Sequence, residues 1–379
     1  MKVGIITQPL RNNYGGLLQN YALQQVLKKL GHKAITLDQT ETPVSRFKLI
    51  ASCIKTFVLK VIGRGDGRKY YFQLDANEVS CIRKYTQYFV DKYITHTPAM
   101  YKTEDFRNYC IDNKINAIIT GSDQVWRPCY NENIYRSFFD FAVGLDIKRY
   151  AYAASFGVDC WEFTDEQTLK CKELLQHFDA ISVREESGID LCKTYFNQKA
   201  EYVLDPTMLL DKEDYEALVY KENEPACSGN LFTYILDESV EKNNIIEKVA
   251  ESLNLVPFTV MPKHRAYRKN IIQIEDCIYP PVTQWLRAFM DAEYVICDSF
   301  HGAVFSIIFN KPFIVIANPQ RGLSRFSSLL KLYGLENRII SDVENSITVI
   351  DNNIDWENIN MTRNSLKEEA YLFLQQINQ

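Results

Sequence analysis

Short, uninterrupted apolar runs recur along this 379-residue chain, and they limit its fold more than any other feature. In the first half they lie at residues 3–7, 117–120, 150–156, 180–184 and 202–205. Helical or turn patterns separate one run from the next. Runs of this kind are typical of parallel strands that helices cover on both faces. The first half is therefore predicted to be an α/β domain.

A second series of apolar runs follows at 231–236, 256–261, 294–299 and 313–317, again interleaved with helical patterns. Because single hydrophobic cores stop growing at roughly 250–300 residues, two α/β domains are expected. The expected division is an N-terminal domain over 1–205 with a helical insertion around 44–110, a C-terminal domain over 206–350, and a helical segment over 351–379 that packs back on the N-terminal domain.

Loops that directly follow strands are the first place to look for a site, because doubly wound sheets bind ligands outside the carboxyl ends of their strands. The glycine loop 12–16 also leads into a helix N-terminus, whose free N–H groups favour an anion or a hydroxyl, although a tight turn is the competing explanation. It lacks the glycine patterns of dinucleotide and P-loop sites. The residues expected to line a cleft between the domains are Asn13, Tyr14, Gly15, Gly16, Ser122, Asp123 and Trp126.

His301 lies between Phe300 and Gly302, where a predicted strand meets a very apolar segment. A lone histidine is often a structural residue. Here the junction of strand and helix, the small Gly302 and the nearby Asp298 favour function, because a carboxylate can orient an imidazole that acts as general acid or base. We therefore expect His301 and Asp298 to be catalytic.

Three arginines stand in loops after predicted strands: Arg184, Arg321 and Arg325. A salt bridge at a helix start would explain Arg184, and a solvated loop would explain the other two. The planar guanidinium also binds phosphate or carboxylate with two parallel hydrogen bonds, so three such residues suit a small polyanion. The histidines show no metal-ligand spacing with cysteines or carboxylates, and no metal site is expected.

The net charge of −5 argues against a general attraction to nucleic acid, which requires a basic face. The apolar stretch at the N-terminus breaks at Gln8 and Pro9, too early for a signal peptide. No window approaches the roughly 18 apolar residues of a membrane span. A cytoplasmic location is the expectation.

Residues 46–64 form a basic amphipathic pattern, with apolar residues on one helical face and lysines or arginines beside them. Such a helix can lie in an acidic membrane surface. An insertion that packs on its own domain is the simpler interpretation. If the helix is exposed, we expect peripheral contact with the inner face of the membrane.

Seven segments in order resemble the polysaccharide pyruvyltransferase family: NNYGGLLQNYALQ, GSDQVWRP, SFG, ISVREESG, VLDPTMLL, DSFHGAVFSIIFNKPFIVI and RGLSRFSSLL. They span residues 12 to 330. The resemblance implies two Rossmann-like domains that face a cleft, as in the GT-B glycosyltransferases. It also implies phosphoenolpyruvate as donor, no cofactor, and a sugar acceptor that becomes a pyruvate ketal.

By that resemblance, His301 matches the catalytic histidine of the family, and Arg184 and Arg321 match basic residues that bind the donor. Many members carry arginine two residues before the histidine, where this chain has Ser299. Arg325 is the candidate to replace that contact. The departure indicates a subfamily with another acceptor or another donor.

The chemistry of phosphoenolpyruvate fits these residues, because its phosphate and carboxylate require fixed cations once they are desolvated. His301 would protonate the methylene carbon, and Asp298 or Asp123 would act as base or hydroxyl anchor. Two alternatives remain open: a GT-B glycosyltransferase that uses a nucleotide sugar, and a catalytically silent protein that binds acidic glycans.

Overall fold

The computed structural model describes residues 1–40, 54, 58, 76–131, 133–264, 273–317, 323–350 and 352–378, and within them the chain forms two parallel sheets. The first has the order β2-β1-β3-β4-β5-β6. Its strands are β1 (Lys2–Ile6), β2 (Lys33–Thr36), β3 (Ala117–Thr120), β4 (Lys148–Ala154), β5 (Ala180–Val183) and β6 (Glu201–Tyr202). The predicted parallel α/β architecture of the first half is confirmed.

The first helix shows how the sequence builds this half. α1 (Tyr14–Lys29) begins where the Asn13 side chain accepts a hydrogen bond from the Gly16 amide, and it ends before Gly31, whose φ is +84°. Its apolar stripe lies buried on the sheet. The other helices of this half are α3 (Ala76–Ile82), α4 (Lys84–Tyr93), α5 (Thr103–Asp112), α6 (Asp165–Leu175) and α7 (Glu186–Leu191).

The second sheet has the order β11-β10-β9-β7-β8 and is also parallel. Its strands are β7 (Leu231–Tyr234), β8 (Pro257–Phe258), β9 (Tyr294–Cys297), β10 (Phe313–Ile316) and β11 (Ile339–Ile340). Its helices are α8 (Lys212–Glu222), α9 (Val240–Leu253), α10 (Val282–Asp291), α11 (Phe300–Ile308), α12 (Ser324–Lys331) and α13 (Val343–Ile350).

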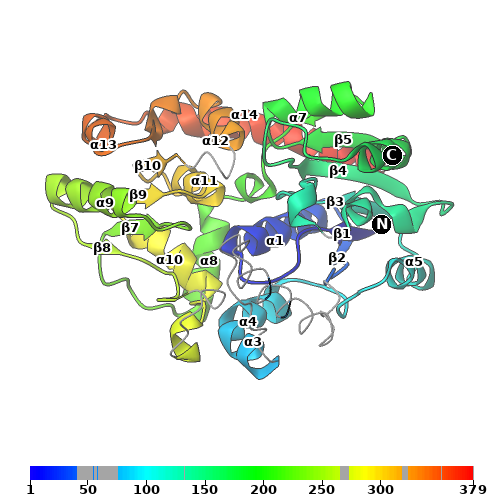
Figure 1. Cartoon of the computed structure of the whole chain (residues 1–379), viewed down its shortest axis with the longest axis horizontal. Coiled ribbons are helices and arrows are strands. Elements are labelled where there is room, and N and C mark those ends of the chain that lie inside the picture. Colours follow the sequence, from blue (N-terminus) through cyan, green and yellow to red (C-terminus); the bar gives the residue numbers. More distant parts are fainter. Residues whose placement is uncertain are drawn as a thin grey trace.

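The two sheets lie side by side, with α1 and α11 between them (Figure 1). One continuous hydrophobic cluster joins both halves. The last helix, α14 (Trp356–Gln375), returns to the first sheet, where the Phe373 ring packs 5.9 Å from that of Tyr152. This arrangement brings the carboxyl ends of both sets of strands toward the middle of the molecule.

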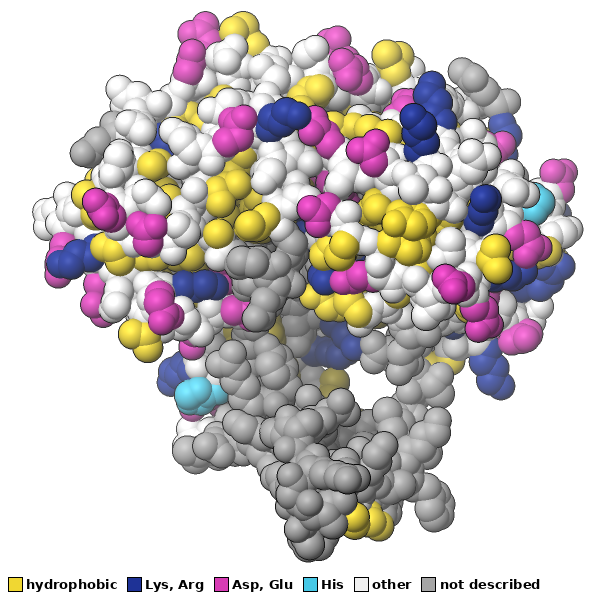
Figure 2. Space-filling model, turned by 45° about the horizontal axis from the view of Figure 1, so that its top comes forward, with side chains coloured by type: hydrophobic (Ala, Val, Ile, Leu, Met, Phe, Trp, Pro, Cys, Tyr) yellow, Lys and Arg dark blue, Asp and Glu magenta, His cyan; other side chains and the backbone are white. Residues whose placement is uncertain are grey.

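The basic amphipathic pattern at 46–64 falls outside the described residues apart from Ile54 and Val58, whose side chains are exposed. Its membrane contact stays a prediction. No helix in the described part of the chain is long and apolar enough to cross a membrane. On the face shown in Figure 2, acidic and basic side chains are interspersed rather than gathered into one basic field.

Candidate functional site at the facing strand ends

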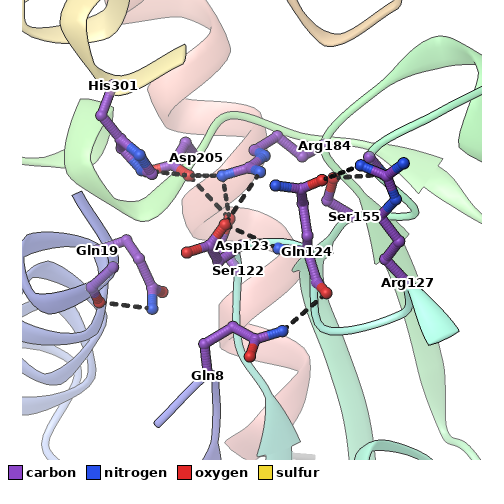
Figure 3. A network of polar contacts seen from close by, with 12 residues as sticks. Gln8, Gln19, Ser122, Asp123, Gln124, Arg127, Ser155, Arg184, Asp205 and His301 are labelled. Atoms are coloured by element: carbon purple, nitrogen blue, oxygen red, sulfur yellow. Dashed lines mark hydrogen bonds and ion pairs between the residues drawn. The ribbon is translucent and has the colours of Figure 1, made fainter. Parts of the chain in front are cut away.

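Arg184 directly follows β5, and its side chain is buried between the two halves. One terminal nitrogen, Nη1, donates to Asp205 Oδ2 at 2.9 Å and to Ser122 Oγ at 3.3 Å (Figure 3). The other, Nη2, lies 3.7 Å from Asp123 Oδ1. Its guanidinium carbon lies 4.2 Å from the centre of the Phe300 ring, which belongs to the second half. Nη2 and Nε make no hydrogen bond with a described residue.

Asp205 is the centre of this network, although the division of the chain expected from sequence marks it only as the last residue of the first domain. Its Oδ1 accepts from the Thr207 amide at 3.0 Å and from the Thr207 hydroxyl at 2.6 Å, while Oδ2 accepts from Ser122 at 2.8 Å. Oδ2 also lies 3.6 Å from His301 Nε2. Burial alone would raise the pKa of Asp205, but His301, Arg184 and Thr207 outweigh burial and hold that pKa well below its usual value.

His301 is the second residue of α11, and its side chain is almost fully buried. It packs directly on Gly15 at the start of α1: a Cβ added to Gly15 would lie 2.1 Å from His301 Nδ1. A glycine is therefore required at position 15 by close approach rather than by a turn. His301 Nε2 makes no hydrogen bond with a described residue. The two halves thus meet at this imidazole.

Asp298 does not orient His301, which corrects the sequence-based expectation. Its carboxylate accepts from the amides of Leu236 and Asp237, at 2.6 Å and 3.0 Å, and from Lys242 Nζ at 2.5 Å. These groups follow the neighbouring strand β7 or lie on α9, and they use both oxygens. The carboxylate beside His301 is that of Asp205.

Asn13, Gly16 and Asp123 come together at the start of α1. Asn13 Oδ1 accepts from the Gly16 amide at 3.1 Å, and its Nδ2 donates to Asp123 Oδ2 at 2.9 Å. Asp123 has a φ of +80°, which is costly for a residue with a side chain. This backbone directs its carboxylate between Asn13 and Arg184. The predicted proximity of the loops 12–16 and 121–126 is therefore observed.

Arg325, on α12, is buried and reaches the same aromatic ring as Arg184, with 5.9 Å between its guanidinium carbon and the Phe300 centroid. Burial, followed by the charge of Arg184, lowers the pKa of Arg325 to about 10. Two cations from different halves therefore approach one ring in spite of their repulsion. Arg321 lies outside the described residues. Ser299 precedes α11 and is nearly buried.

The alternative explanation for Arg184 was a salt bridge at the start of the following helix. The two acidic residues that follow Arg184 do not form it. Glu185 is fully buried, and its Oε1 accepts from the amides of Phe156 and Gly157, at 2.7 Å and 3.2 Å. It therefore holds the loop after β4 in place. Glu186 instead pairs with Lys331 of α12 at 2.9 Å across the two halves.

Two aromatic residues expected in the cleft serve packing instead. Trp126 is fully buried, and its ring stacks 5.0 Å from that of Phe138 in the core. Tyr14 is also buried; its hydroxyl donates to the Pro280 carbonyl at 2.8 Å, and its ring stacks on Trp285. Neither ring is available to a ligand. Among the described residues, no group of three or more His, Cys, Asp or Glu side chains could hold a metal ion.

Solved structures share the whole architecture at low sequence identity. The UDP-GlcNAc 2-epimerase of Methanocaldococcus jannaschii, in complex with UDP-GlcNAc and UDP, has a TM-score of 0.53 and 10% identity, and the match covers 99% of each chain. A second structure of that epimerase gives 0.51 and 11%, with 98% of this chain and 100% of the other covered. The expected GT-B-like fold is thereby confirmed.

Sequence comparison goes further than the fold. A search among curated proteins found no match. The family model for polysaccharide pyruvyl transferase, however, matches residues 13–320. That span includes Asn13, Asp123, Arg184, Asp205 and His301, the residues that meet at the facing strand ends. The chain therefore belongs to the polysaccharide pyruvyl transferase family and is a transferase.

Proposed function

We propose that the protein transfers the pyruvyl group of phosphoenolpyruvate to two hydroxyls of a sugar in a surface polysaccharide or its lipid-linked precursor, giving a pyruvate ketal. The observation that carries this proposal is the pair of buried guanidiniums, Arg184 and Arg325, that two halves of the chain direct at Phe300. Family membership supplies the reaction class. The donor and the acceptor are our inference.

A substrate that carries a phosphate and a carboxylate would provide acceptors for the N–H groups of Arg184 that lack them. Buried N–H groups of a cation are costly when they lack acceptors, by roughly 1–3 kcal/mol each or more. Nε and Nη2 of Arg184 are in this state. Two oxygens of a phosphate or carboxylate group would satisfy both with two parallel bonds, and the negative charge would also offset the repulsion between Arg184 and Arg325. The site is thus prepared for an anion before it arrives.

We expect His301 to deliver the proton that starts the reaction. Its Nε2 has no hydrogen-bond partner among the described residues, and Asp205 at 3.6 Å offers the protonated imidazole an ion pair. Transfer of that proton to the methylene carbon leaves the central carbon electron-poor, and a sugar hydroxyl attacks it. Attack by a second hydroxyl expels phosphate and closes the ketal. Three protons move in this reaction, one from His301 and one from each hydroxyl. One of them stays on the new methyl group, one leaves with hydrogen phosphate, and one returns to His301.

Asp123 is the candidate base for an attacking hydroxyl. Its carboxylate lies next to Arg184 and is held by Asn13 at 2.9 Å. Asp298 is no longer a candidate for this role, because Lys242 and two amides use its oxygens. The proposed machinery is therefore His301, Asp205 and Asp123, with Arg184 and Arg325 for the donor; Arg321 remains a further donor candidate from the sequence.

The test is to incubate the protein with phosphoenolpyruvate and a panel of bacterial surface oligosaccharides. We expect phosphate release that depends on the acceptor, and an acid-labile pyruvate ketal on the product by mass spectrometry. Arg184→Lys should raise KM for phosphoenolpyruvate, because an ammonium cannot form the bidentate contact. Release of UDP from a UDP-sugar, with phosphoenolpyruvate left intact, would instead establish a glycosyltransferase.

A further inference from the structure

A groove of about 310 Å³ lies between the two halves, away from the His301 network. One wall is α4, with Tyr85, Tyr88 and Tyr93; the other consists of Glu222 and Glu224 and of the start of α10. The volume is at the lower end of the range for small-molecule sites, roughly 300–1,000 Å³. The mechanism proposed above uses none of these residues.

The tyrosines of this groove form an aromatic platform in which Tyr88 and Tyr93 are fixed by hydrogen bonds. Tyr85 is 37% and Tyr88 48% exposed, so a ligand can reach both rings. Glu222 holds the platform: it accepts from the Tyr88 hydroxyl at 3.1 Å, from Lys92 Nζ at 2.7 Å, and from the Tyr93 hydroxyl. Rings that are already fixed lose little conformational entropy when a ligand binds.

The chemistry of the groove suits a pyranose ring better than a lipid or an apolar peptide. A sugar ring has C–H groups that pack on an aromatic face, and hydroxyls that need acceptors and donors at its edge. Here the rings lie beside the carboxylates of Glu222 and Glu224 and the ammonium of Lys84. An acyl chain would cover these charged groups and offer them no hydrogen bond.

Hydrogen bonds tie the helix that lines the groove, α4, to the loop before α1. Thr86 of α4 donates to Asn12 Oδ1 at 3.0 Å, and the Tyr14 hydroxyl donates to the Pro280 carbonyl, next to Pro281 of the groove. Gly15, three residues after Asn12, packs on His301. Three residues span at most about 11 Å. Asn13, between Asn12 and Gly15, is exposed, so an oligosaccharide with one sugar at His301 would reach the groove over this loop.

We propose that this groove binds the sugar units of the acceptor that adjoin the reacting one. The inference rests on the proposed function, because it requires an oligosaccharide acceptor. It explains why exposed tyrosines and carboxylates gather at a junction of the two halves. It also predicts that longer acceptors bind more tightly than the single sugar that reacts.

The experiment measures binding without donor, so that it does not depend on turnover. A glycan array of bacterial surface oligosaccharides is followed by calorimetry with the best tetrasaccharide and with its terminal monosaccharide. We expect the double variant Tyr85→Ala/Tyr88→Ala to weaken tetrasaccharide binding roughly tenfold, as the loss of two ring contacts implies. Tyr85→Phe/Tyr88→Phe, which keeps both rings, should retain most of the affinity.

Tyr101→Ala is the matched control, because Tyr101 is 40% exposed but lies outside the groove. Equal tetrasaccharide affinity for the wild type and the double alanine variant would overturn the proposal, as would the absence of any binding glycan or displacement of the glycan by a polyprenyl phosphate. Glycan binding that depends on the tyrosines, without consumption of phosphoenolpyruvate, would support the groove and contradict the proposed donor.

Discussion

Two aspartates, Asp205 and Asp298, lie buried near the carboxyl ends of strands, one in each half of the molecule, and their surroundings differ. Asp205 forms an ion pair with Arg184 and lies beside His301 of the other half. Asp298 is neutralised within its own half, by Lys242 and two amides. Burial at a strand end is therefore not sufficient to make an acid functional. What distinguishes Asp205 is that its partners come from both sides of the molecule.

The largest effect is expected from His301→Ala, which removes a partner that Asp205 has and Asp298 lacks. Turnover should fall by about 10²–10⁴, the usual contribution of a general acid. Phosphate release measures this, and calorimetry with phosphoenolpyruvate should show nearly unchanged donor affinity because Arg184 and Arg325 remain. Wild-type phosphate release would remove His301 from the mechanism and make the two aspartates equivalent.

Asp298→Ala should damage the fold instead of the chemistry. It leaves the buried ammonium of Lys242 without its carboxylate, a change that typically lowers the free energy of unfolding by about 3–5 kcal/mol. Urea denaturation measures the loss, and KM for phosphoenolpyruvate should stay the same. The control is Lys248→Ala on the same helix, which breaks an exposed pair with Glu251 and should cost less than about 1 kcal/mol. A raised KM for phosphoenolpyruvate with an unchanged free energy of unfolding would return Asp298 to the active site.

The smallest effect is the acid dependence of stability. The folded state holds the pKa of Asp205 below its unfolded value of about 3.9, so the unfolded chain binds this proton first as the pH falls. Asp205 therefore stabilises the fold fully above about pH 4, and the contribution declines below it by at most about 1.4 kcal/mol per pH unit. Urea midpoints between pH 5 and pH 3 should decline less steeply in Asp205→Asn than in the wild type. Identical slopes would show that Asp205 is not held as a carboxylate by its partners.

Much of the fold could be predicted because continuous apolar runs specify strands that are covered on both faces. The runs at 117–120 and 294–299 contain the buried strands β3 and β9. The run at 256–261 contains only the two-residue strand β8. Strand length at a sheet edge depends on the pairing partner, which hydropathy does not encode.

The sequence predicted those site residues that lie in a loop next to a strand and also have a side chain suited to catalysis or binding. Arg184, His301, Asn13, Ser122 and Asp123 follow or flank strands, and the structure brings them together. Asp205 was missed although it also follows a strand, since the sequence marked it only as the end of the first domain. The interpretation of Asp298 failed because its partner, Lys242, lies 56 residues earlier in the chain. The prediction that Trp126 lines the cleft was wrong, because the sequence of a loop does not indicate which way an aromatic ring points.

Gly15 makes the spacing of the two halves depend on a single hydrogen atom. A methyl group at position 15 would lie 2.1 Å from Nδ1 and 2.7 Å from Cβ of His301, so rotation of the imidazole alone would not relieve the overlap. α1 and α11 would have to move apart, and with them the halves that carry Arg184 and Arg325. Calorimetry with phosphoenolpyruvate should therefore show weaker donor binding in Gly15→Ala, a spacing defect that His301→Ala does not produce.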